Sequence, residues 1–144
     1  MPATLTLTEP ATFYLHYDAA TQLLRGRWPT PVLDADLRGH YAELLAQAQA
    51  HAGCRYWLLD MRQRNWHMPS FGAWFSAEFA APVRAALGQP VFIACLLSAR
   101  HQTAAESARS QAIQRACARH DVYPYFFASE EAALDWLHYQ QGLY

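Results

Sequence analysis

Lysine is absent from this sequence of 144 residues, and neither sign of charge is in large excess. All eleven basic side chains are arginines, and twelve acidic residues give a formal net charge of −1. A chain so balanced carries no electrostatic signature of binding to nucleic acid or to an anionic membrane surface, and we expect neither as a partner. The absence of lysine reflects either genomic base composition or a use for planar guanidinium groups, which bind carboxylates, phosphates and aromatic rings.

Paired cysteine motifs and common catalytic signatures are also missing. The three cysteines, Cys54, Cys95 and Cys117, are widely spaced without a CxxC motif, which indicates reduced thiols. No GxSxG, GxGxxG or P-loop pattern supports a hydrolase or nucleotide-binding class. His51 and Cys54 form an HxxC pair, but one pair does not make a metal site. We therefore expect no metal, no cofactor and no catalytic residues, and hence a protein that is not an enzyme.

Long hydrophobic runs are likewise missing, since no window approaches the length of a membrane span. The first residues, MPATLTLTEPAT, lack the basic and apolar regions of a secretory signal, so we expect a cytoplasmic protein. The length fits one domain with a single core. Residues 1–11 have no clear period and predict a loose lead-in, followed by one domain at 12–144.

What is present is a regular alternation of strand-like and helix-like segments. FYLHYD and QLLRGRW predict an antiparallel hairpin, and YWLLDM and PVFIACLL predict buried parallel strands. VYPYFF predicts a last strand, which Pro124 marks as a sheet edge. With the helices between them, the predicted fold class is α/β. It is a five-stranded mixed sheet in the order β-β-α-β-α-β-α-β-α, mostly parallel with one antiparallel edge strand.

Four helices complete this order. The first is predicted from Asp34 to Ala52, and the second begins near Ser70 with a break or kink at Pro82. The third, from Ala104 to Arg119, is rich in alanine and begins with a Thr103 capping box, so it can lie close to the sheet. Ser129 is predicted to cap the last helix.

The sharpest polar cluster comprises Asp60, Arg62 and Arg64, directly after a buried strand. The crevice outside the carboxyl ends of parallel strands is the usual ligand position, and two arginines there can hold a carboxylate or phosphate. The alternative is that Asp60 pairs with Arg62 or caps the loop and so fixes the junction.

Aromatic residues crowd the same stretch. Phe71, Phe75 and Phe79 have the spacing of a buried stripe on the second helix. Trp66 and Trp74 fit that stripe less well and, if exposed, predict a partner surface or a lid. The polar members of the stretch, His67 and Ser70, join the candidate binding residues, although Ser70 also suits a helix cap. A further candidate contact surface or dimer contact is the strand face that bears Tyr14, His16, Arg25 and Arg27.

Three segments together resemble a known family: WLLDMR, AWFSAEFAAPVRAALGQPVFIACLLS and YFFASEEAALDWL. They are similar to the SpoIIAA-like proteins, which include STAS domains and their uncharacterised bacterial relatives, over roughly Phe13 to His138. In the STAS proteins that antagonise anti-sigma factors, a phosphorylatable serine follows the aspartate that ends the third strand. Here no serine or threonine occurs between Asp60 and Ser70, so the phosphorylation switch is not carried over.

The resemblance implies a non-catalytic regulatory or protein-interaction domain. Its partner would be an unidentified protein or a second copy of the chain in a homodimer, bound through the Asp60 to Trp74 junction. The alternative is a domain that binds an anionic or apolar small molecule between the second helix and the sheet. The alanine-rich third helix and the aromatic second helix leave room for such a pocket.

Overall fold

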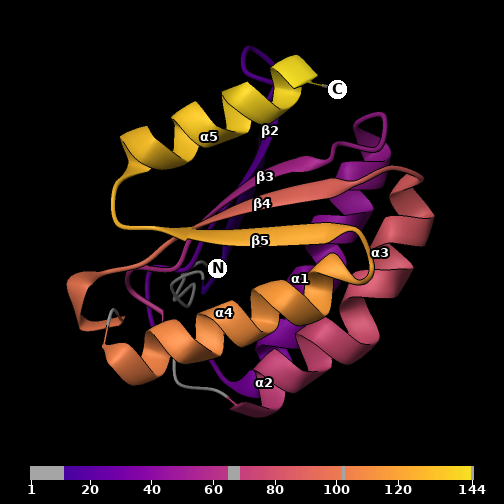
Figure 1. The fold of residues 1–144 in the computed structure, drawn as a ribbon. Coiled ribbons are helices and arrows are strands. Elements are labelled where there is room, and N and C mark those ends of the chain that lie inside the picture. Colours follow the sequence, from indigo (N-terminus) through magenta and orange to yellow (C-terminus); the bar gives the residue numbers. More distant parts are fainter. Residues whose placement is uncertain (1–11, 65–68, 102, 144) are drawn as a thin grey trace, which may run out of the picture.

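The computed structural model describes residues 12–64, 69–101 and 103–143. The predicted lead-in at 1–11 and two of the candidate residues, Trp66 and His67, lie outside the described residues. All the described strands belong to one sheet, which helices cover on both faces (Figure 1).

The sheet has the order β1-β2-β3-β4-β5, so strands that follow one another in the chain also lie side by side. β1 and β2 are antiparallel, and each later strand is parallel to the one before it. The predicted five-stranded mixed sheet is therefore confirmed, as is the edge position of Pro124. The strands are β1 (Tyr14–Asp18), β2 (Leu23–Arg27), β3 (Tyr56–Asp60), β4 (Val91–Leu96) and β5 (Val122–Phe127).

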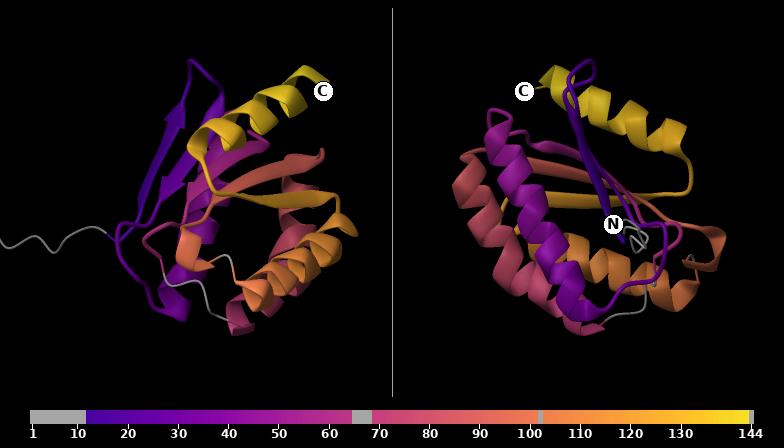
Figure 2. Two further views of the ribbon diagram at one scale, coloured as in Figure 1. Left: turned by 60° about the vertical axis from the view of Figure 1, so that its left-hand side comes forward. Right: turned by 180° about the vertical axis from the view of Figure 1, so that it is seen from behind.

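The helices form two layers of unequal size. The layer below the sheet in Figure 1 holds every helix between β2 and β5, whereas the last helix covers the opposite face alone, as the rear view in Figure 2 also shows. The helices are α1 (Asp34–Ala50), α2 (Pro69–Trp74), the π-helical turn η1 (Phe75–Phe79), α3 (Ala80–Leu87), the 3₁₀ turn η2 (Ala99–His101), α4 (Ala104–Ala118) and α5 (Glu130–Leu143).

The side chains of β4 show how the two layers divide the core. All six residues of the strand are buried. Because successive side chains of a strand point to opposite faces, Ile93 and Cys95 pack among the residues beneath the sheet. Phe92 and Leu96 pack in a second cluster with Ala133 and other residues of α5. The near-continuous apolar run in the sequence thus reflects helices on both faces of a central strand.

Side-chain caps and residues with left-handed backbone angles determine where three of the helices begin or end. Thr103 Oγ1 accepts the backbone N–H of Glu106 at 3.2 Å, and Ser129 Oγ accepts that of Ala132 at 3.1 Å, so both predicted caps are confirmed. α1 ends two residues before the predicted Ala52, because Ala52 and Gly53 take left-handed backbone angles of φ 58° and 69°.

The predicted interruption of the second helix lies just before Pro82 rather than at it. η1 widens the helix over Phe75–Phe79, and the N–H of Ala80 donates to the Phe75 carbonyl, five residues back. Proline in an ordinary helix lacks an N–H and its ring collides with the carbonyl four residues before it. The wide turn opens the backbone there, so that Pro82 lies in the first turn of α3.

Candidate functional site

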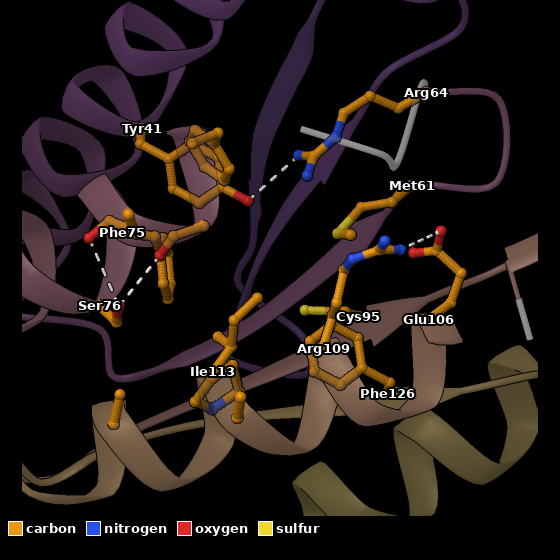
Figure 3. Close-up of a pocket in the computed structure, with 16 residues that line it drawn as sticks. Tyr41, Met61, Arg64, Phe75, Ser76, Cys95, Glu106, Arg109, Ile113 and Phe126 are labelled. Carbon is orange, nitrogen blue, oxygen red and sulfur yellow. Dashed lines mark hydrogen bonds and ion pairs between the residues drawn. The ribbon is translucent and has the colours of Figure 1, made fainter. Parts of the chain in front are cut away.

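A cavity of about 440 Å³ lies beneath the sheet between α4 and the segment formed by α2 and η1 (Figure 3). We call it the α4 cavity. Apolar and small side chains make up most of its wall, with a few polar groups among them. The lining residues are Tyr41, Met61, Arg64, Phe71, Gly72, Ala73, Phe75, Ser76, Cys95, Glu106, Arg109, Ala112, Ile113, Ala116, Pro124 and Phe126.

The alanines of α4 explain why this space exists. Ala112, Ile113 and Ala116 line the cavity from α4, and Phe71 and Phe75 of the aromatic stripe line it as well; the two alanines each extend only a methyl group into it. Only Ser110 and Cys117 of α4 are buried. The sequence predicted either close packing of this helix on the sheet or a pocket beside it, and the described structure has the pocket.

Arg64 supplies a charge inside the α4 cavity. Its exposed fraction is 1%, which is rare for arginine. The guanidinium carbon lies 4.5 Å from the Trp28 ring centroid and 5.4 Å from that of Phe71. Nη1 donates a hydrogen bond of 3.2 Å to the hydroxyl of Tyr41. Aromatic faces stabilise a desolvated guanidinium through their negative quadrupoles, which accounts for a buried arginine at this position.

Tyr41 comes from α1 and is 2% exposed. Its ring packs against the stripe, 5.1 Å from Phe71 and 5.4 Å from Phe75 between centroids. Its hydroxyl accepts the bond from Arg64 and points into the α4 cavity (Figure 3). Burial raises the pKa of Tyr41, although the charge of Arg64 lowers it in part. The phenol therefore keeps its proton at neutral pH.

Glu106 and Arg109 also line the α4 cavity. Arg109 Nη1 donates to Glu106 Oε1 at 2.8 Å across one turn of α4. These two opposite charges therefore lie together on the wall of the cavity. Ser76 Oγ donates to the Gly72 carbonyl at 3.0 Å, which ties this hydroxyl to its own helix.

Cys95 lines the α4 cavity from β4 but is a poor nucleophile. It is 4% exposed, and burial raises the pKa of its thiol to about 12. Burial likewise raises the pKa of Cys117 to about 12. Because only the thiolate is reactive, both remain protonated at neutral pH, in keeping with the reduced core thiol predicted for Cys95. All three cysteines are free.

The predicted cluster of Asp60, Arg62 and Arg64 is not one site. Arg62 Nε and Nη2 donate to the two carboxylate oxygens of Asp60 at 2.9 and 2.7 Å, and Arg62 lies 4.0 Å from Glu130 at the start of α5. Arg64 instead lies on the opposite face of the sheet, against α1 and α2. Asp60 and Arg62 form the internal pair that was the alternative, apart from Arg64, and a binding role for the three residues stays a prediction.

The pKa of Asp60 reflects this pair. Burial raises the pKa, but the side-chain and backbone hydrogen bonds from Arg62 and the charges of Arg62 and Arg27 outweigh it, so the pKa lies below its ordinary value. The carboxylate is therefore ionised at neutral pH and holds the turn that follows β3, where it also accepts the Arg62 backbone N–H at 3.1 Å.

The aromatic residues of the second predicted helix lie mostly in the core. Phe71, Phe75 and Phe79 are each 5–6% exposed, which confirms the buried stripe. Trp74 is partly buried and packs against that stripe, 5.2 Å from Phe79 between centroids, and its role as a partner surface stays a prediction. Ser70 lies in the first turn of α2.

The predicted strand face is only partly open. Tyr14 is 48% exposed, with the Arg27 guanidinium 4.7 Å from its ring centroid, and His16 is also exposed. Arg25 lies 3.6 Å from Asp18 and 3.9 Å from Glu130 of α5. A contact or dimer role for this face stays a prediction.

A second cavity, of about 310 Å³, lies on the other side of α4. Its wall is more polar and consists of Leu97, His101, Ser107, Ser110, Gln111, Gln114, Phe126, Phe127 and Ala128. Within the described ranges, no group of three or more histidine, cysteine, aspartate or glutamate side chains could hold a metal ion. His51 stacks on Tyr17 at 4.2 Å between centroids, whereas Cys54 faces the carbonyl of Tyr56.

Sequence reasoning missed Tyr41 as a site residue because its spacing assigns it equally well to the core stripe of α1. It also did not select Met61, Ser76 or Phe126, which carry no motif. The one signal for this cavity was the pairing of a long alanine-rich helix with an aromatic one.

Comparisons of the chain with protein-family models, with curated proteins and with solved structures found no match. The resemblance to SpoIIAA-like proteins therefore stays a prediction. Among the helices that the structure describes, none is long and apolar enough to cross a membrane.

Proposed function

We propose that this protein is a binding domain for a small, largely apolar organic molecule, which occupies the α4 cavity. The observation that carries the proposal is a cavity of about 440 Å³ that has apolar walls and holds the buried guanidinium of Arg64. Small-molecule sites are typically apolar concavities of roughly 300–1,000 Å³ with a few polar groups that fix orientation.

The size of the α4 cavity decides between kinds of occupant. Its volume of about 440 Å³ is that of a site for a small organic molecule. An inorganic ion alone would leave most of that space unfilled. An organic body in contact with Phe71, Phe75 and Ile113 would bury apolar surface, at about 25 cal/mol for each Å² removed from water.

The interaction-domain function implied by the SpoIIAA-like resemblance stays a prediction, as does the absence of enzymatic activity. Its proposed surface was the Asp60 to Trp74 junction. In the described part of that junction, Asp60 and Arg62 bind each other, Arg64 is buried, and Trp74 packs inward. The α4 cavity therefore has the stronger structural support.

The test is a binding titration with three naphthalene derivatives that differ in charge: 2-naphthoate, 2-naphthamide and 2-naphthylmethylammonium. NMR spectra of the ¹⁵N-labelled protein would follow each titration. We expect at least one compound to bind and to shift the amide signals of residues that line the α4 cavity.

Two matched variants make this test specific. Ala116→Phe places a ring in the α4 cavity, whereas Ala108→Phe places the same ring at an exposed position of α4 outside both cavities. We expect Ala116→Phe to abolish binding and Ala108→Phe to leave it unchanged. Equal binding by both variants, or no binding of any compound to the wild-type protein, would contradict the proposed function.

A further inference from the structure

We infer that the second cavity, of about 310 Å³, is a separate binding site for a compact uncharged molecule that carries both hydrogen-bond donors and acceptors, as a pyranose sugar or a nucleobase does. We call this space the η2 cavity, because His101 of η2 lines it. Its described lining shares only Phe126 with that of the α4 cavity, so either site can be tested without the other.

The η2 cavity lies beside the carboxyl ends of two parallel strands. Leu97 directly follows β4, whereas Phe126 and Phe127 are the last two residues of β5, and Ala128 follows them. Both strands end on the left of the sheet in Figure 1, and α4 begins on the same side. Open α/β sheets usually bind their ligands in crevices outside the carboxyl ends of the strands. The position therefore makes this cavity a candidate site.

One side of α4 supplies the polar part of the wall. Its four lining residues recur at positions i, i+3, i+4 and i+7, which lie on one face of a helix. They are Ser107, Ser110, Gln111 and Gln114. A helix that packs on a sheet ordinarily turns apolar side chains toward it. A row of hydroxyl and amide groups beside the strand ends is instead suited to hydrogen-bond a molecule in the cavity.

Ser110 is the most buried of these four residues, with 7% exposed. Ser76 of η1 donates to the carbonyl four residues before it, whereas the side chain of Ser110 makes no hydrogen bond with any residue that the structure describes. Serine in a helix can ordinarily satisfy its hydroxyl by such a bond, and a buried hydroxyl without a partner is unfavourable. A ligand in the η2 cavity would supply that partner.

The described lining of the η2 cavity contains no aspartate, glutamate, arginine or lysine. The titratable side chain in it is His101. Its Nδ1 accepts the backbone N–H of Ser98 at 3.3 Å, so the ring is neutral in this arrangement and carries its proton on Nε2. An ionised ligand would give up hydration here without gaining an ion pair. The matching ligand is therefore uncharged.

The strands supply an apolar surface to the same space. Leu97 is 4% exposed, and Phe126 and Phe127 add aromatic side chains. Nucleobases stack on aromatic rings through their π-faces, and the C–H face of a pyranose ring is also apolar. Each glutamine amide presents an acceptor and an NH₂ donor, which suits the mixed polar edge of either kind of molecule. An apolar face and a polar edge thus define the ligand.

Two matched pairs of probes test the ligand class: methyl β-glucopyranoside with methyl β-glucuronide, and uracil with orotate. In each pair the second compound carries a carboxylate. We expect at least one neutral probe to bind with a millimolar or lower Kd and to shift the amide signals of Ser107, Ser110 and Gln114 in ¹⁵N NMR spectra. Its carboxylate counterpart should bind about tenfold or more weakly, because no described cation offsets the loss of hydration.

The pattern of binding separates the outcomes. Binding of the glucoside supports a sugar site, and binding of uracil supports a nucleobase site. If neither neutral probe shifts these amide signals at millimolar concentration, the η2 cavity holds only water and the inference is overturned. A carboxylate that binds as tightly as its neutral counterpart would overturn the assignment of an uncharged ligand.

A pair of variants locates the binding. Gln111→Phe places a ring in the η2 cavity from an exposed position, whereas Ala108→Phe places the same ring outside both cavities. Gln111→Phe should abolish binding of the neutral probe, and Ala108→Phe should leave it unchanged. Equal binding by these two variants would contradict the site. Ala116→Phe, which fills the α4 cavity, should not affect the neutral probe. If it abolished binding, the probe would occupy the α4 cavity, and a separate site would be excluded.

A second pair of variants tests the buried hydroxyl. Ser110→Ala should weaken binding of the neutral probe by about three- to tenfold, the effect of one hydrogen bond. Ser76→Ala removes a hydroxyl that is bonded to its own helix and should change the affinity by less than about twofold. Urea denaturation checks that both variants are folded. An unchanged affinity in Ser110→Ala would overturn the role of Ser110 as a ligand contact.

Discussion

The guanidinium carbon of Arg64 lies 4.5 Å from the centroid of the Trp28 ring, and this contact joins the α4 cavity to the core beneath β2. The other edge of Trp28 donates its Nε1 proton to Nδ1 of His40 at 3.0 Å. Arg64 therefore contacts Trp28, and Trp28 contacts His40. A substitution of Arg64 should have a measurable effect on His40, and a substitution of His40 should have one on Arg64.

Tyr41→Phe should destabilise the protein, whereas the double variant Arg64→Met with Tyr41→Phe should not. The single change removes the acceptor of a buried guanidinium N–H, at a cost of about 1–3 kcal/mol in the free energy of unfolding. The double change replaces both partners of this hydrogen bond by apolar groups of similar volume, which is often neutral or stabilising. Urea denaturation measures both.

The outcome decides what the buried charge is for. If the double variant stays within about 1 kcal/mol of the wild type, then Arg64 is not required for folding, and its place in the cavity is explained by binding. A double variant less stable than Tyr41→Phe would instead assign Arg64 a structural role.

Stability should fall in mild acid because of His40. Burial lowers the pKa of His40 below its ordinary value of 6.5, and the nearby charge of Arg64 lowers it further, although Glu43 and Asp36 raise it. The unfolded chain therefore binds the proton more tightly than the folded one. The contribution of His40 is complete above about pH 6.5 and is lost as the pH falls through the folded pKa.

The matched control for this effect is His40→Gln, whose amide oxygen can accept the Trp28 proton but does not titrate. Urea denaturation at about pH 7.5 and about pH 5 should show a smaller pH effect in the variant than in the wild type. The lowered pKa of Asp60 and of Asp121 affects stability in more acid solution, below their ordinary value of 3.8. An unchanged pH dependence in the variant would contradict the assignment to His40.

Removal of Arg62 should raise the pKa of Asp60 with little loss of stability. Arg62→Gln takes away the side-chain hydrogen bonds and the charge that hold this pKa low, and the burial of Asp60 then raises it. The guanidinium is partly exposed, so the pair should contribute no more than about 1 kcal/mol to folding. A ¹³C NMR titration of the Asp60 carboxyl measures the shift, and an unchanged pKa would contradict the pairing.

The sequence predicted the sheet, both helix caps and the buried stripe because these depend on local patterns. β4 is buried on both faces, and its unbroken run of apolar residues indicates this directly. Thr103 and Ser129 act on amides three residues away. Each of these signals lies within a few residues of its effect.

The candidate site was harder to predict because it depends on turns and on distant elements. Arg62 and Arg64 are two residues apart, a spacing that places side chains on one face of an extended strand. The chain turns after Met61, however, and the Arg64 N–H donates to the Met61 carbonyl at 3.2 Å. The two arginines therefore lie on opposite faces of the sheet. Tyr41, the partner of Arg64, is 23 residues away in the sequence.

Helix α4 should be less protected from hydrogen exchange than α1. Ser110 and Cys117 are its only buried residues, whereas α1 buries Leu37, Tyr41, Leu44 and Ala48. Cavities lie on both of its sides. Elements with few buried contacts open locally at a lower free energy than the core. Hydrogen exchange followed by mass spectrometry should therefore show faster exchange in α4 than in α1.

A bound ligand should reduce this difference in exchange rate between α4 and α1. A molecule in the α4 cavity would contact Ala112, Ile113 and Ala116, and it stabilises the closed state by mass action. Saturating 2-naphthoate should slow exchange in α4 more than in α1 for the wild type and for Ala108→Phe, but not for Ala116→Phe. Equal slowing in both helices would show that the ligand stabilises only the globally folded state. Without such selective protection, α4 would be a fixed wall of the cavity.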